Sequence, residues 1–275
     1  MDLPVVEDRL TQSSPPFFQQ PAAYSGAATE IQGALVFARA SPRDAEQATK
    51  AVRAACASPT LAERASFRQT RDGRRISAPS LRLATEIARC WGNVSYGVTE
   101  LRRDPAQGES KGECEMLAFA WDLETNLRVA TSFIAALGPR DTYDTNAGLA
   151  ASRLRECLFL VLPGELVDEA KRLTTRTLAE TCGANLPGCI ARLAQEFAAL
   201  GIAPARIERA IGLAPGGFAP DGGQLASIDV ATLRVILRSI RAGEIAGEEE
   251  FPPLDAPDAR GTEAAERSAQ DPAAF

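Results

Sequence analysis

The apolar residues in the middle of the chain change their spacing, and this change limits the possible folds more than any other feature. They alternate with polar residues over 94–99, 117–121 and 127–133, and then follow helical spacing from Leu149 to Val161. A period of two is typical of strands with one buried face, and a period of three to four is typical of a helix. Turn-forming residues separate the alternating segments, so the connections are short. The sequence therefore predicts an antiparallel meander of three strands followed by one helix.

A basic hairpin and two helices are predicted before the meander. Residues 65–77 surround Asp72-Gly73, a dipeptide typical of tight hairpin turns. A helix is expected from Ser41, as its N-cap, to about Cys56, and another from about Pro79 to Trp91. The window 64–77, which contains the hairpin, is the most basic of the chain and holds five arginines: Arg64, Arg68, Arg71, Arg74 and Arg75.

After the meander and its helix, the sequence predicts a separate helical module with helices at about 186–200, 204–211 and 230–241. The last segment, 244–275, carries nine acidic and two basic residues and is rich in Pro and Ala, a composition typical of disorder. The predicted organisation has four parts: a flexible N-terminal arm at 1–28, an α+β core at 29–180, a three-helix module at 186–243 and an acidic disordered tail at 244–275. The predicted fold class is α+β, with a β-meander and a β-hairpin backed by helices.

Composition indicates a globular chain without a membrane span. The 275 residues are 45% hydrophobic and 24% charged, and no apolar stretch approaches the length of a membrane helix. The first residues lack the basic and apolar regions of a signal peptide. The six cysteines contain no C-x-x-C pair, so we expect reduced thiols and a cytoplasmic location.

The residue types restrict the possible chemistry. The chain has no histidine, which excludes Ser-His and Cys-His nucleophile pairs and histidine zinc sites. No phosphate-binding glycine-rich motif occurs, so we expect no nucleotide cofactor and no enzymatic activity. One alternative stays open, because four acidic residues at strand ends could hold a divalent metal as in a nuclease: Glu113, Glu115, Asp122 and Glu124.

Arginine placement suggests contacts with nucleic-acid phosphates. The net charge of −6 comes from the acidic tail, since the rest of the chain has 28 basic and 27 acidic residues. The planar guanidinium fork forms two-point contacts with phosphate oxygens. Trp91 and Trp121 could stack on bases, although an aromatic in an apolar strand is more often part of a core. The candidate DNA-binding residues are Arg74, Arg75, Arg82, Arg128, Arg140, Asn146, Arg153 and Arg155.

Several strings carry a resemblance to a family of mostly uncharacterised phage and prophage proteins. They are Ala78–Ala84, Trp91–Asn93, Ala120–Asn126, Pro139–Asp141 and Gly164–Val167, and the resemblance covers about Ala38 to the end of the third C-terminal helix. That family is similar in layout to the single-strand annealing proteins of the Redβ/RecT superfamily.

The resemblance implies an oligomeric ring or filament that holds single-stranded DNA for pairing without ATP. It also implies that the C-terminal module binds a phage exonuclease or a host single-strand-binding protein. The chain departs from the family at Ala78, at Thr85 and in the short loop 135–138, where relatives have a longer basic loop. A phage scaffold protein that does not bind DNA stays open as a second function.

Overall fold

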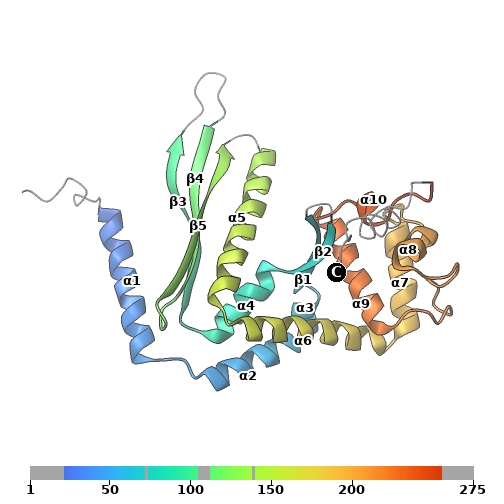
Figure 1. Cartoon of the computed structure of the whole chain (residues 1–275), viewed down its shortest axis with the longest axis horizontal. Coiled ribbons are helices and arrows are strands. Elements are labelled where there is room, and N and C mark those ends of the chain that lie inside the picture. The colour runs from blue at the N-terminus through green and yellow to red at the C-terminus, as the bar shows by residue number, and fades with distance from the viewer. Residues whose placement is uncertain (1–21, 72–73, 105–111, 138–139, 256–275) are drawn as a thin grey trace, which may run out of the picture.

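The computed structural model describes residues 22–71, 74–104, 112–137 and 140–255, with the backbone alone at 22–28, 71 and 140–145. The elements are, in chain order, α1 (Ala22–Ala40), α2 (Ala45–Cys56), α3 (Pro59–Ala62), β1 (Ser66–Arg71), β2 (Arg74–Pro79), α4 (Leu81–Trp91), β3 (Val94–Asp104), β4 (Gly112–Asp122), β5 (Leu127–Leu137), α5 (Arg140–Val161), α6 (Gly164–Gly183), α7 (Leu186–Ala198), α8 (Pro204–Ile211), α9 (Ser227–Arg241) and α10 (Gly247–Glu250). The α+β class is confirmed, with helices packed on two small antiparallel sheets (Figure 1). Within the described ranges, no helix combines the length and apolar character that crossing a membrane requires.

The predicted meander and hairpin are both present. Strands β3, β4 and β5 are neighbours in that order, each antiparallel to the next, and β1 pairs with β2 from Ser66 opposite Pro79. The meander strands are 11 residues long, so they extend well beyond the alternating segments that identify them in the sequence. Asp72-Gly73, the predicted hairpin turn, lies outside the described residues.

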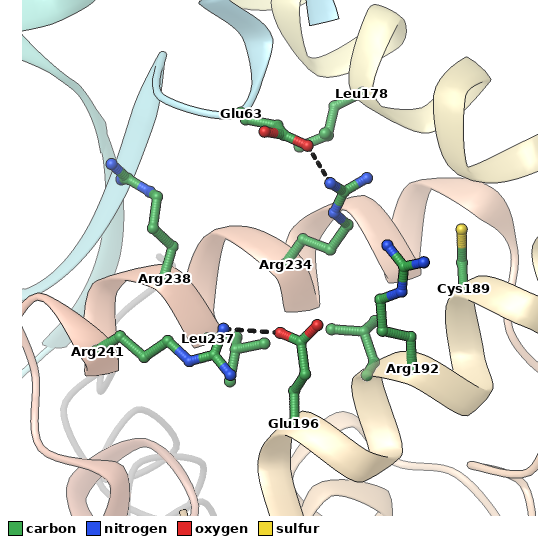
Figure 2. Close-up of a pocket in the computed structure, with 10 residues that line it drawn as sticks. Glu63, Leu178, Cys189, Arg192, Glu196, Arg234, Leu237, Arg238 and Arg241 are labelled. Atoms are coloured by element: carbon green, nitrogen blue, oxygen red, sulfur yellow. Dashed lines mark hydrogen bonds and ion pairs between the residues drawn. The ribbon is translucent and has the colours of Figure 1, made fainter. Parts of the chain in front are cut away.

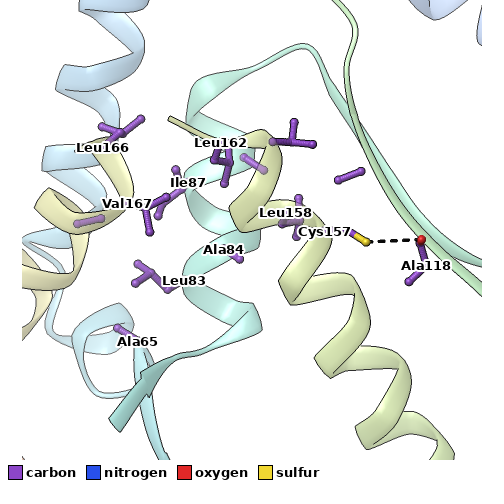
Figure 3. Packing of buried hydrophobic residues seen from close by; sticks show 14 of the residues in the cluster. Ala65, Leu83, Ala84, Ile87, Ala118, Cys157, Leu158, Leu162, Leu166 and Val167 are labelled. Carbon is purple, nitrogen blue, oxygen red and sulfur yellow. Dashed lines mark hydrogen bonds between the residues drawn. The ribbon is translucent and has the colours of Figure 1, made fainter. Parts of the chain in front are cut away.

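Helix α5 covers one face of the meander, and small residues of β4 allow it to approach closely. Ala118 and Ala120 are fully buried beneath it, and the Cys157 thiol of α5 donates to the Ala118 carbonyl at 3.6 Å (Figure 3). The sequence favours the larger residues of β4, such as Phe119 and Trp121, as its buried side. That interpretation is wrong for β4, because the helix packs on the side that carries alanine.

A first hydrophobic core lies between the sheet, α4, α5 and the start of α6. Leu83 and Ile87 of α4 lie one turn apart and face Leu158 of α5 and Val167 of α6 (Figure 3). The spacing of apolar residues in the sequence therefore predicts the buried side of α4 correctly. Its N-cap is Ser80, whose hydroxyl accepts from the Leu83 amide at 3.2 Å.

A second core lies within the C-terminal helices, and α6 connects it to the first. Phe197 of α7 is its centre, with the ring of Phe251 edge-on at a centroid distance of 5.3 Å. The predicted end of the core domain at residue 180 falls within α6, which continues to Gly183. The helical module is thus joined to the α+β core by a continuous helix.

Both predicted terminal boundaries need correction. Residues 244–255 belong to the fold and not to a disordered tail, because Ile245 and Phe251 are buried among the C-terminal helices. Residues 22–28 belong to α1 and not to a flexible arm. The remaining parts of the predicted arm and tail, 1–21 and 256–275, lie outside the described residues.

A nearly buried cluster of charges fixes the start of α2 against the sheet. The Arg43 guanidinium donates to Asp122, at the end of β4, and at 2.9 Å to Glu124, and it lies 4.9 Å from the centroid of the Trp91 ring. The predicted N-cap Ser41 is wrong, since Asp44 caps α2 by accepting from two backbone amides. Arg43 instead forms the long-range contact, which joins segments about eighty residues apart in the chain.

We expect Asp122→Ala to lower the free energy of unfolding by about 3 kcal/mol, because it leaves the Arg43 charge partly unpaired and desolvated. The Arg43 side chain is only 9% exposed. Urea denaturation measures the change. The matched control is Glu46→Ala, which breaks the Lys50 pair on α2, where the glutamate side chain is 79% exposed; we expect less than about 1 kcal/mol there. Equal losses in the two variants would contradict a special role for the buried cluster.

The same cluster predicts an acid-sensitive component of stability. Burial by itself raises the pKa of the Glu124 carboxyl, but hydrogen bonds from Asn93 and Arg43 outweigh it and hold the pKa below its usual value. A carboxyl with a lowered folded-state pKa stabilises the fold above its unfolded pKa, and the contribution is lost as pH falls through the folded value. We expect the wild type to lose this part of its stability below about pH 4, and Glu124→Gln to show a smaller loss between neutral and acid pH in urea titrations. An unchanged pH profile would contradict the assignment.

Candidate nucleic-acid interface

The eight residues predicted to bind DNA are distributed over four elements. Their positions are as follows: Arg74 and Arg75 in β2, Arg82 in α4, Arg128 in β5, and Arg140, Asn146, Arg153 and Arg155 in α5. Arg74 and Arg82 are exposed, and the side chain of Arg140 lies outside the described residues. The other five take part in contacts within the chain, which differ from one residue to the next.

The described candidates on α5 are occupied by neighbouring groups. Asn146 donates to the Ala136 carbonyl at 2.5 Å and so joins the start of α5 to the end of β5. Arg153 pairs with Glu156 at 3.1 Å, and Arg155 lies over the Phe67 ring of β1 at 4.7 Å. Successive helix residues differ by about 100° in direction, so Arg153 and Arg155 leave the helix on opposite flanks of Leu154. Both are partly exposed, but they do not form a single cationic groove.

The basic hairpin is partly used to hold the C-terminal segment. Arg75 donates to the backbone carbonyls of Glu249 and Glu250, at 3.2 and 2.7 Å, and Arg68 forms an ion pair with the buried Glu250 at 3.1 Å. These contacts satisfy carbonyls at the end of α10. Arg75 therefore has a structural role that its position in a basic sequence window does not indicate.

The face of the meander opposite to α5, which we call the outer sheet face, carries aromatic rings beside an exposed arginine. Its side chains include Leu117, Phe119, Trp121, Arg128 and Ile134, which point away from the buried alanines of β4. The Arg128 guanidinium lies 5.5 Å from the centroid of the Phe119 ring and 6.0 Å from that of Trp121. Both rings are partly exposed and lie outside the hydrophobic clusters of buried residues.

The two tryptophans thus have different environments. Trp91 packs against the first core and beneath Arg43, so it is a structural residue. Trp121 lies directly opposite Arg128 in the strand register, and its indole nitrogen donates to Asn126 at 3.1 Å. Trp121 is therefore not part of the first core, and its partly exposed side chain lies next to Arg128.

A second cationic region, which sequence reasoning missed, lines a cavity of about 250 Å³ between α6, α7 and α9 (Figure 2). Three of its arginines, Arg234, Arg238 and Arg241, follow one another at intervals of four and three along α9. This spacing places them on one side of a helix and is visible in the sequence. The fourth, Arg192, is on α7.

The acidic residues considered for a metal site lie apart. Glu113 and Glu115 are at the start of β4 and Asp122 at its end, roughly 24 Å from Glu115 at the usual rise per strand residue. Asp122 and Glu124 are bound to Arg43. Among the described residues, no group of three or more histidine, cysteine or acidic side chains is placed to hold a metal ion.

The cysteines are free thiols, and most are in apolar surroundings. Burial raises the pKa of Cys56 to about 11, and burial is also the main cause that raises the pKa of Cys157 and Cys182. A thiol with a raised pKa holds little of the reactive thiolate at neutral pH. These residues are therefore best explained as packing groups.

Comparisons with family models, with curated proteins and with solved structures find no match to the chain. The resemblance to single-strand annealing proteins stays a prediction.

Proposed function

We propose that the chain is a non-enzymatic protein that binds single-stranded DNA and anneals complementary strands without ATP, acting as a homo-oligomer. The observation that carries the proposal is the outer sheet face, where Arg128 lies beside the partly exposed rings of Phe119 and Trp121. Proteins that bind single strands commonly combine aromatic rings, on which bases stack, with cations that contact the phosphates.

This arrangement suits single strands better than duplex DNA. In a duplex the bases are stacked on one another, so aromatic side chains on a sheet have no free base face to contact. In a single strand the base faces are accessible, and stacking is tolerant of sequence because every base has a π-face. A strand held by its base faces and phosphates can still present base edges to a complement.

An oligomer is supported by helix α1, which exposes large apolar side chains. Val36 and Phe37 are 66% and 76% exposed, whereas Ala38 next to them is buried. In Figure 1, α1 runs on the side of the meander away from α5. Neighbouring exposed apolar side chains of this size are typical of an interaction surface, and a second copy of the chain would cover them.

The other parts of the proposal follow from the resemblance. The C-terminal module would bind a phage exonuclease or a host single-strand-binding protein, and the protein would act in the cytoplasm. The exposed face of α1 equally suits a scaffold that assembles without DNA, which is the second candidate function. Native mass measurement together with a DNA titration separates the two, since a scaffold forms oligomers but does not bind oligonucleotides.

We expect Trp121→Ala and Arg128→Ala each to weaken binding to labelled oligothymidylate, by about 1–3 kcal/mol for the tryptophan, because a stacking surface is removed. Fluorescence anisotropy at low salt measures affinity, and annealing of complementary oligonucleotides measures function. Arg176→Ala is the matched control for charge, since its side chain is on α6 and 76% exposed. If the wild type does not bind single strands, or if Trp121→Ala binds as tightly as the control, the proposal is wrong.

We expect Phe37→Asp to convert the oligomer into smaller species, because a charge at the exposed position of α1 cannot be buried in an interface without a large desolvation penalty. Native mass spectrometry reports the change in assembly. Thr49→Asp, on the partly exposed side of α2, serves as the control. A wild type that is monomeric at all accessible concentrations would contradict the oligomer.

A further inference from the structure

The lining of the cavity between α6, α7 and α9 carries more positive than negative side chains. Four arginines and two glutamates line it: Arg192, Arg234, Arg238, Arg241, Glu63 and Glu196. Glu63 accepts from Arg234, and Glu196 accepts from Arg241 at 2.8 Å (Figure 2). The two carboxylates are therefore each used by one arginine, which leaves two guanidiniums without a partner among the cavity's carboxylates.

The two remaining guanidiniums, those of Arg238 and Arg192, differ in their hydrogen bonds. Arg238 donates to the Ser66 carbonyl, but its Nε atom is buried without a hydrogen-bond partner in the part of the chain that the structure describes. The nearest carboxylate to Arg238 is that of Glu244, at 3.9 Å, which is at the limit of an ion pair. For Arg192, no hydrogen bond or ion pair is formed with any described residue.

The charges of the cavity lie between apolar walls. Leu193 and Leu237 form apolar walls of the cavity, and Figure 2 shows Arg192 and Arg234 turned toward the same part of it. Two guanidiniums that face one another repel, and water screens part of that repulsion because Arg192 is exposed. An anion bound between them would remove that repulsion and would gain charge-assisted hydrogen bonds.

We propose that this cavity binds a phosphate group in its dianionic form. A dianion matches the net charge of +2 on the lining, which has four arginines and two glutamates, whereas a single carboxylate would neutralise only half of it. Guanidinium forks also fit the geometry of phosphate oxygens. The cavity volume of about 250 Å³ is slightly below the ~300–1,000 Å³ of pockets for drug-sized ligands, which suits a small group. The site lies where the C-terminal module meets α6 and the end of α3, and its lining contains no residue of the outer sheet face.

Isothermal titration of the full-length protein with inorganic phosphate tests the site, with chloride at equal ionic strength as the reference. We expect saturable binding in the wild type and a loss of about tenfold or more in affinity for Arg192→Gln, because a hydrogen-bonding charge is removed. Arg176→Gln, which removes an arginine from the exposed face of α6, is the control and should leave affinity unchanged.

A variant with the opposite expected sign separates ligand binding from a structural role. Glu196→Gln removes a carboxylate that competes for Arg241, so we expect it to bind phosphate more tightly than the wild type. Oligonucleotides with a 5′-phosphate or a 5′-hydroxyl identify the source of the group. A 5′-phosphate preference that Arg192→Gln abolishes indicates a DNA end, and no preference indicates free phosphate. The absence of phosphate binding, or equal losses in Arg192→Gln and Arg176→Gln, would overturn the proposal.

Discussion

Helix α6 is the element on which the arrangement of the whole molecule depends, because it contributes side chains to both hydrophobic cores. Leu166 and Val167, near its start, are buried in the first core, and Cys182, near its end, is buried in the second. Its 20 residues span about 30 Å. Leu178 lies between them and packs with Ala231 of α9 in a third, smaller cluster. A continuous helix of this kind is stiff, so the candidate interface on the sheet and the cationic cavity of the C-terminal module are held on one framework.

The packing of α5 on alanine determines what the opposite face of the sheet presents. Side chains alternate along a strand, so the choice of Ala118 and Ala120 for the inner face of β4 places Phe119 and Trp121 outside. Large aromatic residues on an outer face ordinarily lower solubility. Arg128 covers the rings of Phe119 and Trp121 only in part. The proposed role in DNA binding gives a physical reason for keeping these rings accessible.

Helices and strands could be predicted from the sequence wherever the local spacing of apolar residues determines them. The contacts between distant segments of the chain could not be predicted in this way. The spacing of Leu83 and Ile87 identifies α4 and its buried side, because the apolar residues of an amphipathic helix lie on the one side that packs against the core. The burial direction of β4 could not be read in the same way, since both of its faces are apolar and only the approach of α5 selects one. Arg43 and Phe251 show the same limit. Their partners are about eighty and fifty residues away, and no local pattern connects them.

The sequence does not show which arginines stabilise the fold and which are free to bind a ligand. The structure separates the two groups by the partners of each guanidinium. Arg75 and Arg206 bind backbone carbonyls of the C-terminal segment, and Arg43 binds two carboxylates, so these cations stabilise the fold. An arginine whose guanidinium already has such partners must lose them before it can bind a phosphate, which reduces the net gain. Arg128 and Arg192 do not have that cost, because among the described residues neither forms an ion pair, and Arg128 lies over two aromatic rings. The cations expected to bind external anions are therefore those that remain available, which also include the exposed Arg74 and Arg82. A basic stretch of sequence does not by itself identify them.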